Sequence, residues 1–119
     1  MSMYDFIHHT LAGVCDNRAA IKFKAIDGLP DAICTYYLVA GNPQGFFGGR
    51  PRRENERYSV QYADRDKRNL EPKGKAIRAA MEAAGFLYVG KSPDIPHDDT
   101  GHWSRTLDFR YYEEVTNHG

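Results

Sequence analysis

Two histidines and two aspartates stand close together near the C-terminal end of the chain, and such residues can bind a metal ion or transfer protons. They are His97, Asp98, Asp99 and His102. Neutral imidazole and carboxylate groups are ligands for zinc or manganese. All four lie in one short loop, however, and the sequence shows no ligand from a distant segment. Because Asp-Asp and Asp-Thr-Gly are also ordinary turn sequences, we expect a solvated turn, with a metal site as the alternative.

The two cysteines, Cys15 and Cys34, are the candidate nucleophiles. Neither lies in a recognisable nucleophile motif, and their spacing fits no metal site. Cys34 falls within an apolar run and is expected in the core, whereas Cys15 follows a predicted helix and could be exposed. We therefore expect two structural thiols in a reducing cytoplasm, no cofactor and no enzymatic activity.

A segment rich in Gly, Pro and Arg covers residues 41–56 and is expected to be a long loop. It lacks the Gly-Lys-Ser/Thr ending of a phosphate-binding loop and does not open an amphipathic helix. Two adjacent phenylalanines in it need a burial partner, either in the same domain or in another subunit. A basic cluster begins there and continues beyond it, but acidic residues alternate with it, which favours a mixed-charge, solvated loop. The cluster consists of Arg50, Arg52, Arg53, Arg57, Arg65, Lys67 and Arg68. The candidates for an oligomer or partner interface are Phe46, Phe47, Arg50, Arg52 and Arg53.

The elements that must position these residues are separated by clear turn signals. A helix is predicted over residues 2–11, where Ser2 and Asp5 form a capping box. A second helix is predicted over residues 72–84, with Gly85 as its stop. Its expected buried stripe is Ala76, Ile77, Ala80, Met81 and Ala84. Strands are predicted over residues 21–26, 33–39, 58–62, 86–89 and 103–112. The first is expected to be a short edge strand, and the second a central strand covered on both faces.

These elements predict an α+β fold in one domain spanning residues 1–119. The expected core is a small, mostly antiparallel sheet of about four strands, with two helices packed on it. The strands on either side of the Gly/Pro/Arg loop are expected to pair as one hairpin, and those on either side of the acidic loop as another. The long loop then lies between the central strands of the sheet.

The overall charge favours no particular class of partner. Sixteen basic and sixteen acidic residues cancel, and the pI is near 7.0, so the global charge does not favour nucleic acid or a membrane surface. The first residues lack the basic start and apolar run of a secretory signal. No stretch approaches the roughly 20 apolar residues of a membrane helix.

Four segments in order resemble a known family. They are Gly-Leu-Pro-Asp-Ala-Ile-Cys-Thr-Tyr-Tyr at residues 28–37, Arg-Tyr-Ser-Val-Gln-Tyr at 57–62, Ala-Ile-Arg-Ala-Ala-Met-Glu-Ala-Ala-Gly-Phe at 76–86 and Asp-Thr-Gly-His-Trp-Ser-Arg-Thr-Leu-Asp-Phe-Arg-Tyr at 99–111. In this order they resemble the small tail-terminator and minor capsid (tail completion) proteins of long-tailed bacteriophages and prophages. The resemblance covers nearly the whole chain.

The resemblance implies an α+β subunit that assembles as a ring, usually a hexamer, at the head-proximal end of the tail tube. Such a ring stops tube polymerisation and presents a surface to the head–neck connector proteins. It implies a place in the virion after assembly in the cytoplasm of the host bacterium. The family has no catalytic residues, small-molecule substrate or membrane contact to transfer.

We therefore expect a structural virion assembly protein. A nucleic-acid-binding or regulatory phage protein that uses the arginine-rich loop is one alternative. A head-completion or neck protein of similar α+β design is the second.

Overall fold

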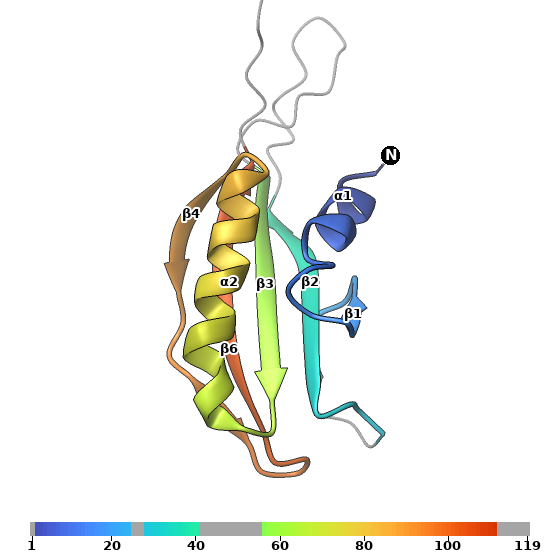
Figure 1. Cartoon of the computed structure of the whole chain (residues 1–119), viewed down its shortest axis with the longest axis vertical. Coiled ribbons are helices and arrows are strands. Elements are labelled where there is room, and N and C mark those ends of the chain that lie inside the picture. The colour runs from blue at the N-terminus through green and yellow to red at the C-terminus, as the bar shows by residue number, and fades with distance from the viewer. Residues whose placement is uncertain (1, 25–27, 41–55, 112–119) are drawn as a thin grey trace, which may run out of the picture.

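The computed structural model describes residues 2–24, 28–40 and 56–111, which form two helices and six strands (Figure 1). A short 3-10 helix, η1, leads directly into the second helix. In chain order the elements are α1 (Met3–Thr10), β1 (Arg18–Ala19), β2 (Ala32–Ala40), β3 (Glu56–Asp64), η1 (Lys67–Asn69), α2 (Leu70–Ala83), β4 (Phe86–Lys91), β5 (Ile95–His97) and β6 (His102–Tyr111).

The described strands build one mixed sheet in the order β1-β2-β3-β6-β4, with β5 also paired to β6. The pair β1–β2 is parallel, and every other pair is antiparallel. The α+β class, the two helices and both predicted hairpin pairings are confirmed. The count of about four strands is wrong, because β1 and β5 hold only two and three residues and carry no periodic signal of their own.

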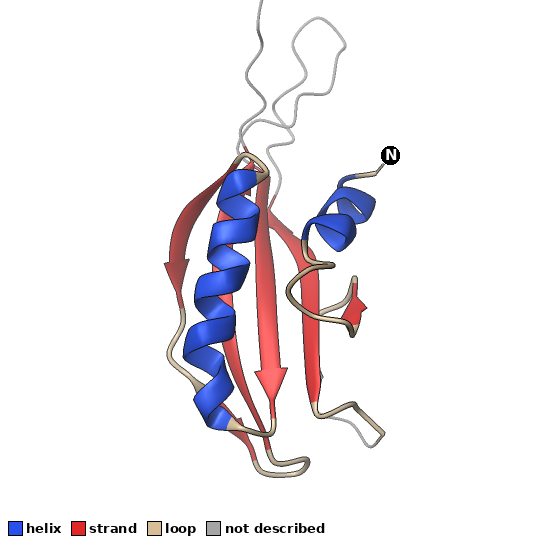
Figure 2. Cartoon of the chain, in the orientation of Figure 1, coloured by secondary structure: helices blue, strands red, loops and turns tan. Residues whose placement is uncertain are grey.

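Both helices lie on one face of the sheet. Figure 2 shows α2 running lengthwise over the middle of the sheet, with α1 beside β2. The main core lies between these helices and the alternate side chains of the strands, and burial of each large apolar side chain contributes roughly 1.5–3 kcal/mol. Its most deeply buried members include Ile7, Leu11, Cys34, Val60, Tyr62, Leu70, Ile77, Met81 and Phe109.

The helix ends follow the predicted capping chemistry, but the buried face of α2 differs from the predicted one. The Ser2 hydroxyl accepts from the Asp5 amide, and the Asp5 carboxylate accepts from the Ser2 amide, which completes the capping box. Helix α2 ends before Gly85, whose φ of 101° lies in the left-handed region. Ala76, predicted to be buried in α2, is exposed. The buried stripe runs instead through Leu70, Gly74, Ile77 and Met81.

The opposite face of the sheet carries a smaller core. Phe23 packs there with Ile33 and Ala63. Its backbone amide donates to the Gln61 side-chain oxygen at 2.8 Å. The strand predicted over residues 21–26 is wrong for its described part, since residues 21–24 adopt no strand. The alternation that suggested a strand reflects one buried phenylalanine, Phe23, between the exposed Lys22 and Lys24.

The strand β2 lies nearer the rim of the sheet than predicted. Only two of its residues, Cys34 and Thr35, pair with β1 on the outer side. Leu38 and Val39 beyond them are exposed, so the expectation of a central strand covered on both faces is wrong for this end of β2. Apolar composition alone does not distinguish a strand in the middle of a sheet from one near its rim.

The predicted loop at residues 41–56 lies outside the described residues except for Glu56, which begins β3. The interface candidates Phe46, Phe47, Arg50, Arg52 and Arg53 fall in this undescribed part. In the described part of the chain, neither helix has the length and apolar character needed to cross a membrane.

Candidate functional site

The acidic loop contains a buried histidine beside two exposed aspartates. Asp98 and Asp99 are exposed, as expected for a solvated turn, and Gly101 closes the turn with a φ of 78°. His102 is fully buried, which the sequence did not indicate. Its Nε2 lies 2.8 Å from the Pro30 carbonyl oxygen, and its Nδ1 lies 2.8 Å from the Thr100 hydroxyl.

These contacts define the role of His102. A carbonyl oxygen can only accept, so Nε2 donates to Pro30, while Nδ1 and the Thr100 hydroxyl share the second hydrogen bond. His97 is engaged separately, with Nε2 at 2.8 Å from the Ser104 hydroxyl. Among the residues that the structure describes, no three His, Cys, Asp or Glu side chains converge as metal ligands. The imidazole of His102 joins two chain segments in the small core.

The two thiols lie in the main core. Cys34 is fully buried as predicted, but Cys15, for which exposure was considered, is also buried. The Cys15 thiol donates to the Asn17 carbonyl at 3.2 Å, and burial raises the pKa of both thiols. Since the thiolate is the nucleophilic form, both sites disfavour nucleophilic chemistry.

The described members of the predicted basic cluster all have partners within the chain. Arg57, Arg65, Lys67 and Arg68 therefore do not form a patch of unopposed charge. Their contacts are Arg57 with Asp108 at 3.8 Å, Arg65 with Asp31, Arg68 with Asp66 at 2.9 Å, and the Lys67 ammonium over the Trp103 ring at 4.4 Å.

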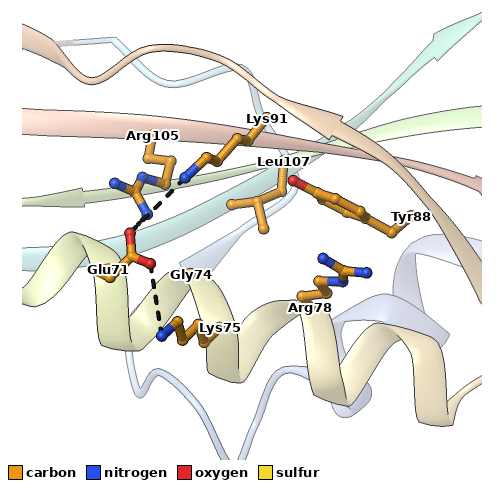
Figure 3. Close-up of a pocket in the computed structure, with 8 residues that line it drawn as sticks. All are labelled: Glu71, Gly74, Lys75, Arg78, Tyr88, Lys91, Arg105 and Leu107. Atoms are coloured by element: carbon orange, nitrogen blue, oxygen red, sulfur yellow. Dashed lines mark hydrogen bonds and ion pairs between the residues drawn. The ribbon is translucent and has the colours of Figure 1, made fainter.

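A polar groove of about 160 Å³ lies between α2, β4 and β6 (Figure 3). At its base Arg105 is 9% exposed and holds two carboxylates. Its Nε and Nη2 donate to Asp94 at 2.8 and 3.1 Å, and its Nη1 donates to Glu71 at 2.6 Å. These hydrogen bonds lower the pKa of Asp94 and of Glu71 and raise that of Arg105.

Helix α2 approaches β6 closely beside this ion pair. A Cβ atom on Gly74 would lie 3.4 Å from both Cδ and Nη1 of Arg105. This is van der Waals distance, so α2 at Gly74 packs directly against the Arg105 side chain. Sequence analysis missed Arg105, although a detectable signal exists. It stands among Trp103, Leu107 and Phe109 on the apolar face of the predicted strand, where a charge requires a buried partner.

Three exposed cations form the rim of the groove. Lys75 and Lys91 approach Glu71 at 3.8 and 3.9 Å (Figure 3). The Arg78 guanidinium lies 4.1 Å above the Tyr88 ring. Arg78 also pairs with Glu82 at 3.0 Å, so each of the three rim cations already contacts a carboxylate of the same chain.

The sheet has two edges, and each carries exposed apolar side chains. On β4, Leu87 and Val89 are 57% and 46% exposed; on β2, Leu38 and Val39 are 42% and 50% exposed. Tyr4 of α1 adjoins the second pair, because its hydroxyl accepts from the Leu38 amide at 3.0 Å. We name these surfaces the β4 edge patch (Leu87, Val89) and the β2 edge patch (Tyr4, Leu38, Val39).

Natural proteins usually protect sheet edges with charged residues or proline. Here both register shifts near the edges fall at valines. Val39 is the extra residue where β2 pairs with β3, and Val89 is the extra residue where β4 pairs with β6. Exposed apolar side chains at two separate edges form the candidate interaction site of the described part of the chain.

Comparison with known proteins adds no assignment, because no protein-family model and no curated protein matches this sequence.

Proposed function

We propose that this protein is a structural subunit that acts by assembling with copies of itself and with neighbouring proteins. The observation that carries the proposal is the pair of exposed apolar edge patches on opposite sides of one sheet. A ring needs two different, mutually complementary surfaces on each subunit, and the two edges provide such a pair. The polar clusters support the same view, since His102, the thiols and Arg105 are all engaged within the fold.

The assembly we propose is the terminating ring of a long-tailed phage. Its support is the ordered set of segments at residues 28–37, 57–62, 76–86 and 99–111, together with the α+β arrangement of two helices on one sheet. In this role the ring, expected to be a hexamer, caps the head-proximal end of the tail tube and stops its growth. Its outer surface then meets the connector proteins of the head and neck.

A reconstituted tail assembly tests this function. Genes adjacent to this one identify the tail-tube and connector proteins to express. The tube protein is polymerised with and without this protein, and tube lengths are measured by electron microscopy. We expect shorter tubes that carry a ring at one end and bind the connector there.

The control is the tube protein with an unrelated small protein at equal concentration. A strictly monomeric protein at high concentration that binds neither tube nor connector would contradict the proposal. Binding to the connector alone would indicate a head-completion role. Affinity for duplex DNA that falls steeply with salt, and is lost when Arg50, Arg52 and Arg53 are reversed in charge, would indicate a nucleic-acid-binding protein.

A further inference from the structure

We propose that the two edge patches are the two halves of one head-to-tail junction, in which the β4 edge patch of one copy packs on the β2 edge patch of the next. The inference rests on the self-association proposed above and identifies the surfaces that carry it. The occupant of each patch is a second copy of this chain.

The first argument is that the two patches lie at the same level of the sheet. Pairing through β3 and β6 places Leu38 on the same rung as Tyr88. The next rung joins Ala40 at one edge to Leu87 at the other. A neighbouring copy in the same orientation, shifted sideways without sliding along the strands, would therefore bring the strand segments that carry the two patches to the same level.

The second argument is strand direction. The pairs β2–β3, β3–β6 and β6–β4 are all antiparallel, so β4 runs opposite to β2. Two copies placed edge to edge in the same orientation would thus continue the antiparallel alternation across the junction. The short strand β1 pairs with β2 only at Cys34 and Thr35, so it does not extend to the β2 edge patch.

The third argument is charge. Stable interfaces bury about 1,200–2,000 Å², more than a few edge side chains supply, so the surfaces beside the edges must also contribute. Helix α1 adjoins the β2 edge patch, and the polar groove adjoins the β4 edge patch, both on the helix-covered face. A head-to-tail junction therefore brings α1 of one copy beside the groove of the other.

Each edge has an exposed charged residue near this level. Asp5 lies beside the β2 edge patch, and Arg78, which also pairs with Glu82 at 3.0 Å in its own chain, lies beside the β4 edge patch. Tyr4 contacts Leu38, and the Arg78 guanidinium lies over Tyr88 on the same rung. Asp5 follows Tyr4 and is exposed. Its hydrogen bonds to Ser2 lower its pKa, so it is ionised at neutral pH. We expect Asp5 of one copy to face Arg78 of the next, across the groove rim.

Engineered disulfides test the junction directly. Val39→Cys and Leu87→Cys are introduced into the same chain, and the protein is oxidised at high concentration. A head-to-tail contact yields a ladder of linked dimers, trimers and larger species on a non-reducing gel. The matched control carries Ile21→Cys and Ile95→Cys, whose parent side chains are 52% and 47% exposed but lie outside both patches. We expect no ladder from the control.

Complementary lysine variants test the polarity of the contact. Val39→Lys and Leu87→Lys should each weaken association on the order of tenfold or more, measured by analytical ultracentrifugation. Each variant keeps one intact patch, so their mixture should form one-to-one dimers and nothing larger. The control Ile95→Lys should associate as the wild type does. Adding Asp5→Arg to Arg78→Asp should restore part of the association lost in Arg78→Asp alone.

The outcomes separate this inference from the proposed function. Linked dimers from Leu87→Cys alone would indicate a symmetric edge contact and overturn the head-to-tail junction. If the wild type forms rings on tail tubes and both lysine variants form them equally well, the head-to-tail junction is also overturned, while the proposed function stands. A wild type that forms no assembly alone or on tubes would reject both.

Discussion

The centre of the helix-covered face and the edges of the same sheet both carry large apolar side chains, but in different surroundings. Phe109 in β6 is fully buried beneath the helices, whereas Leu87 in β4, the neighbouring strand, is 57% exposed. Buried apolar groups stabilise the monomer, and exposed ones contribute only when another surface covers them. The difference indicates that folding and association depend on separate sets of residues in this protein, and substitutions can test that separation.

The largest expected effect is at the centre of the core. Phe109→Ala should lower the free energy of unfolding by about 3–5 kcal/mol, because it removes a fully buried ring and leaves a cavity. Urea denaturation followed by circular dichroism measures the change. If Phe109→Ala does not fold, Phe109→Leu is measured in its place, with a smaller expected loss of stability. A loss under about 0.5 kcal/mol, the usual range for surface substitutions, would contradict the assignment of Phe109 to the core.

The buried ion pair beneath α2 should give the next largest effect. Arg105→Met should destabilise the protein by about 2–3 kcal/mol at neutral pH, since it leaves the Asp94 carboxylate without its guanidinium. Urea titrations at several pH values measure the change. Lys24→Met, at an exposed position, is the control and should leave stability nearly unchanged.

The ion pair between Arg105 and Asp94 also predicts that the stability of the protein depends on pH. Arg105 lowers the pKa of Asp94 in the folded state below its ordinary value of 3.8. The contribution of this ion pair to stability is therefore complete above pH 3.8 and is lost as the pH falls through the folded-state pKa of Asp94. Stability of the wild type should drop in this acidic range more steeply than stability of Arg105→Met. Parallel acid profiles would contradict the ion pair.

The acidic loop should give a smaller effect. His102→Ala should cost about 1–2 kcal/mol, because the Pro30 carbonyl and the Thr100 hydroxyl both lose their partner. Thermal melts with and without zinc complete the experiment, and we expect zinc to leave the melting temperature unchanged. Stabilisation by zinc in the wild type that disappears in His97→Ala would show instead that the loop binds metal.

The smallest expected effect on monomer stability is at the edges. Leu87→Lys should change the free energy of unfolding by less than about 0.5 kcal/mol, since the side chain is more than half exposed. Its effect should appear in sedimentation experiments as weaker association. A large loss of monomer stability would place Leu87 with the core residues and remove the distinction between centre and edge.

Much of the architecture could be predicted from the sequence. Capping chemistry at Ser2 and Asp5, the stop at Gly85 and the alternation of apolar residues are local, and each corresponds to a local feature of the structure. The two hairpin pairings also followed from strands separated by turn residues. Local patterns record which face of an element is apolar, and this was enough to predict the α+β class and the burial of Cys34.

Other features depended on contacts between segments distant in the sequence. Strands β1 and β5 are too short to carry a period, and they are strands only because β2 and β6 lie beside them. His102 is buried because Pro30 and Phe23, from a distant part of the sequence, pack against it on the face of the sheet away from the helices. The Arg105–Glu71 contact joins residues on different elements, and no local pattern pairs them.

The sequence by itself determined the kinds of elements, their inward faces and their turns, because these depend on neighbouring residues along the chain. Only the tertiary structure decided which strands lie at the edges, and hence that Leu38, Val39, Leu87 and Val89 are exposed. The physical reason is that an apolar strand residue is buried or exposed according to what covers it. That depends on the order of strands in the sheet and on the placement of the helices.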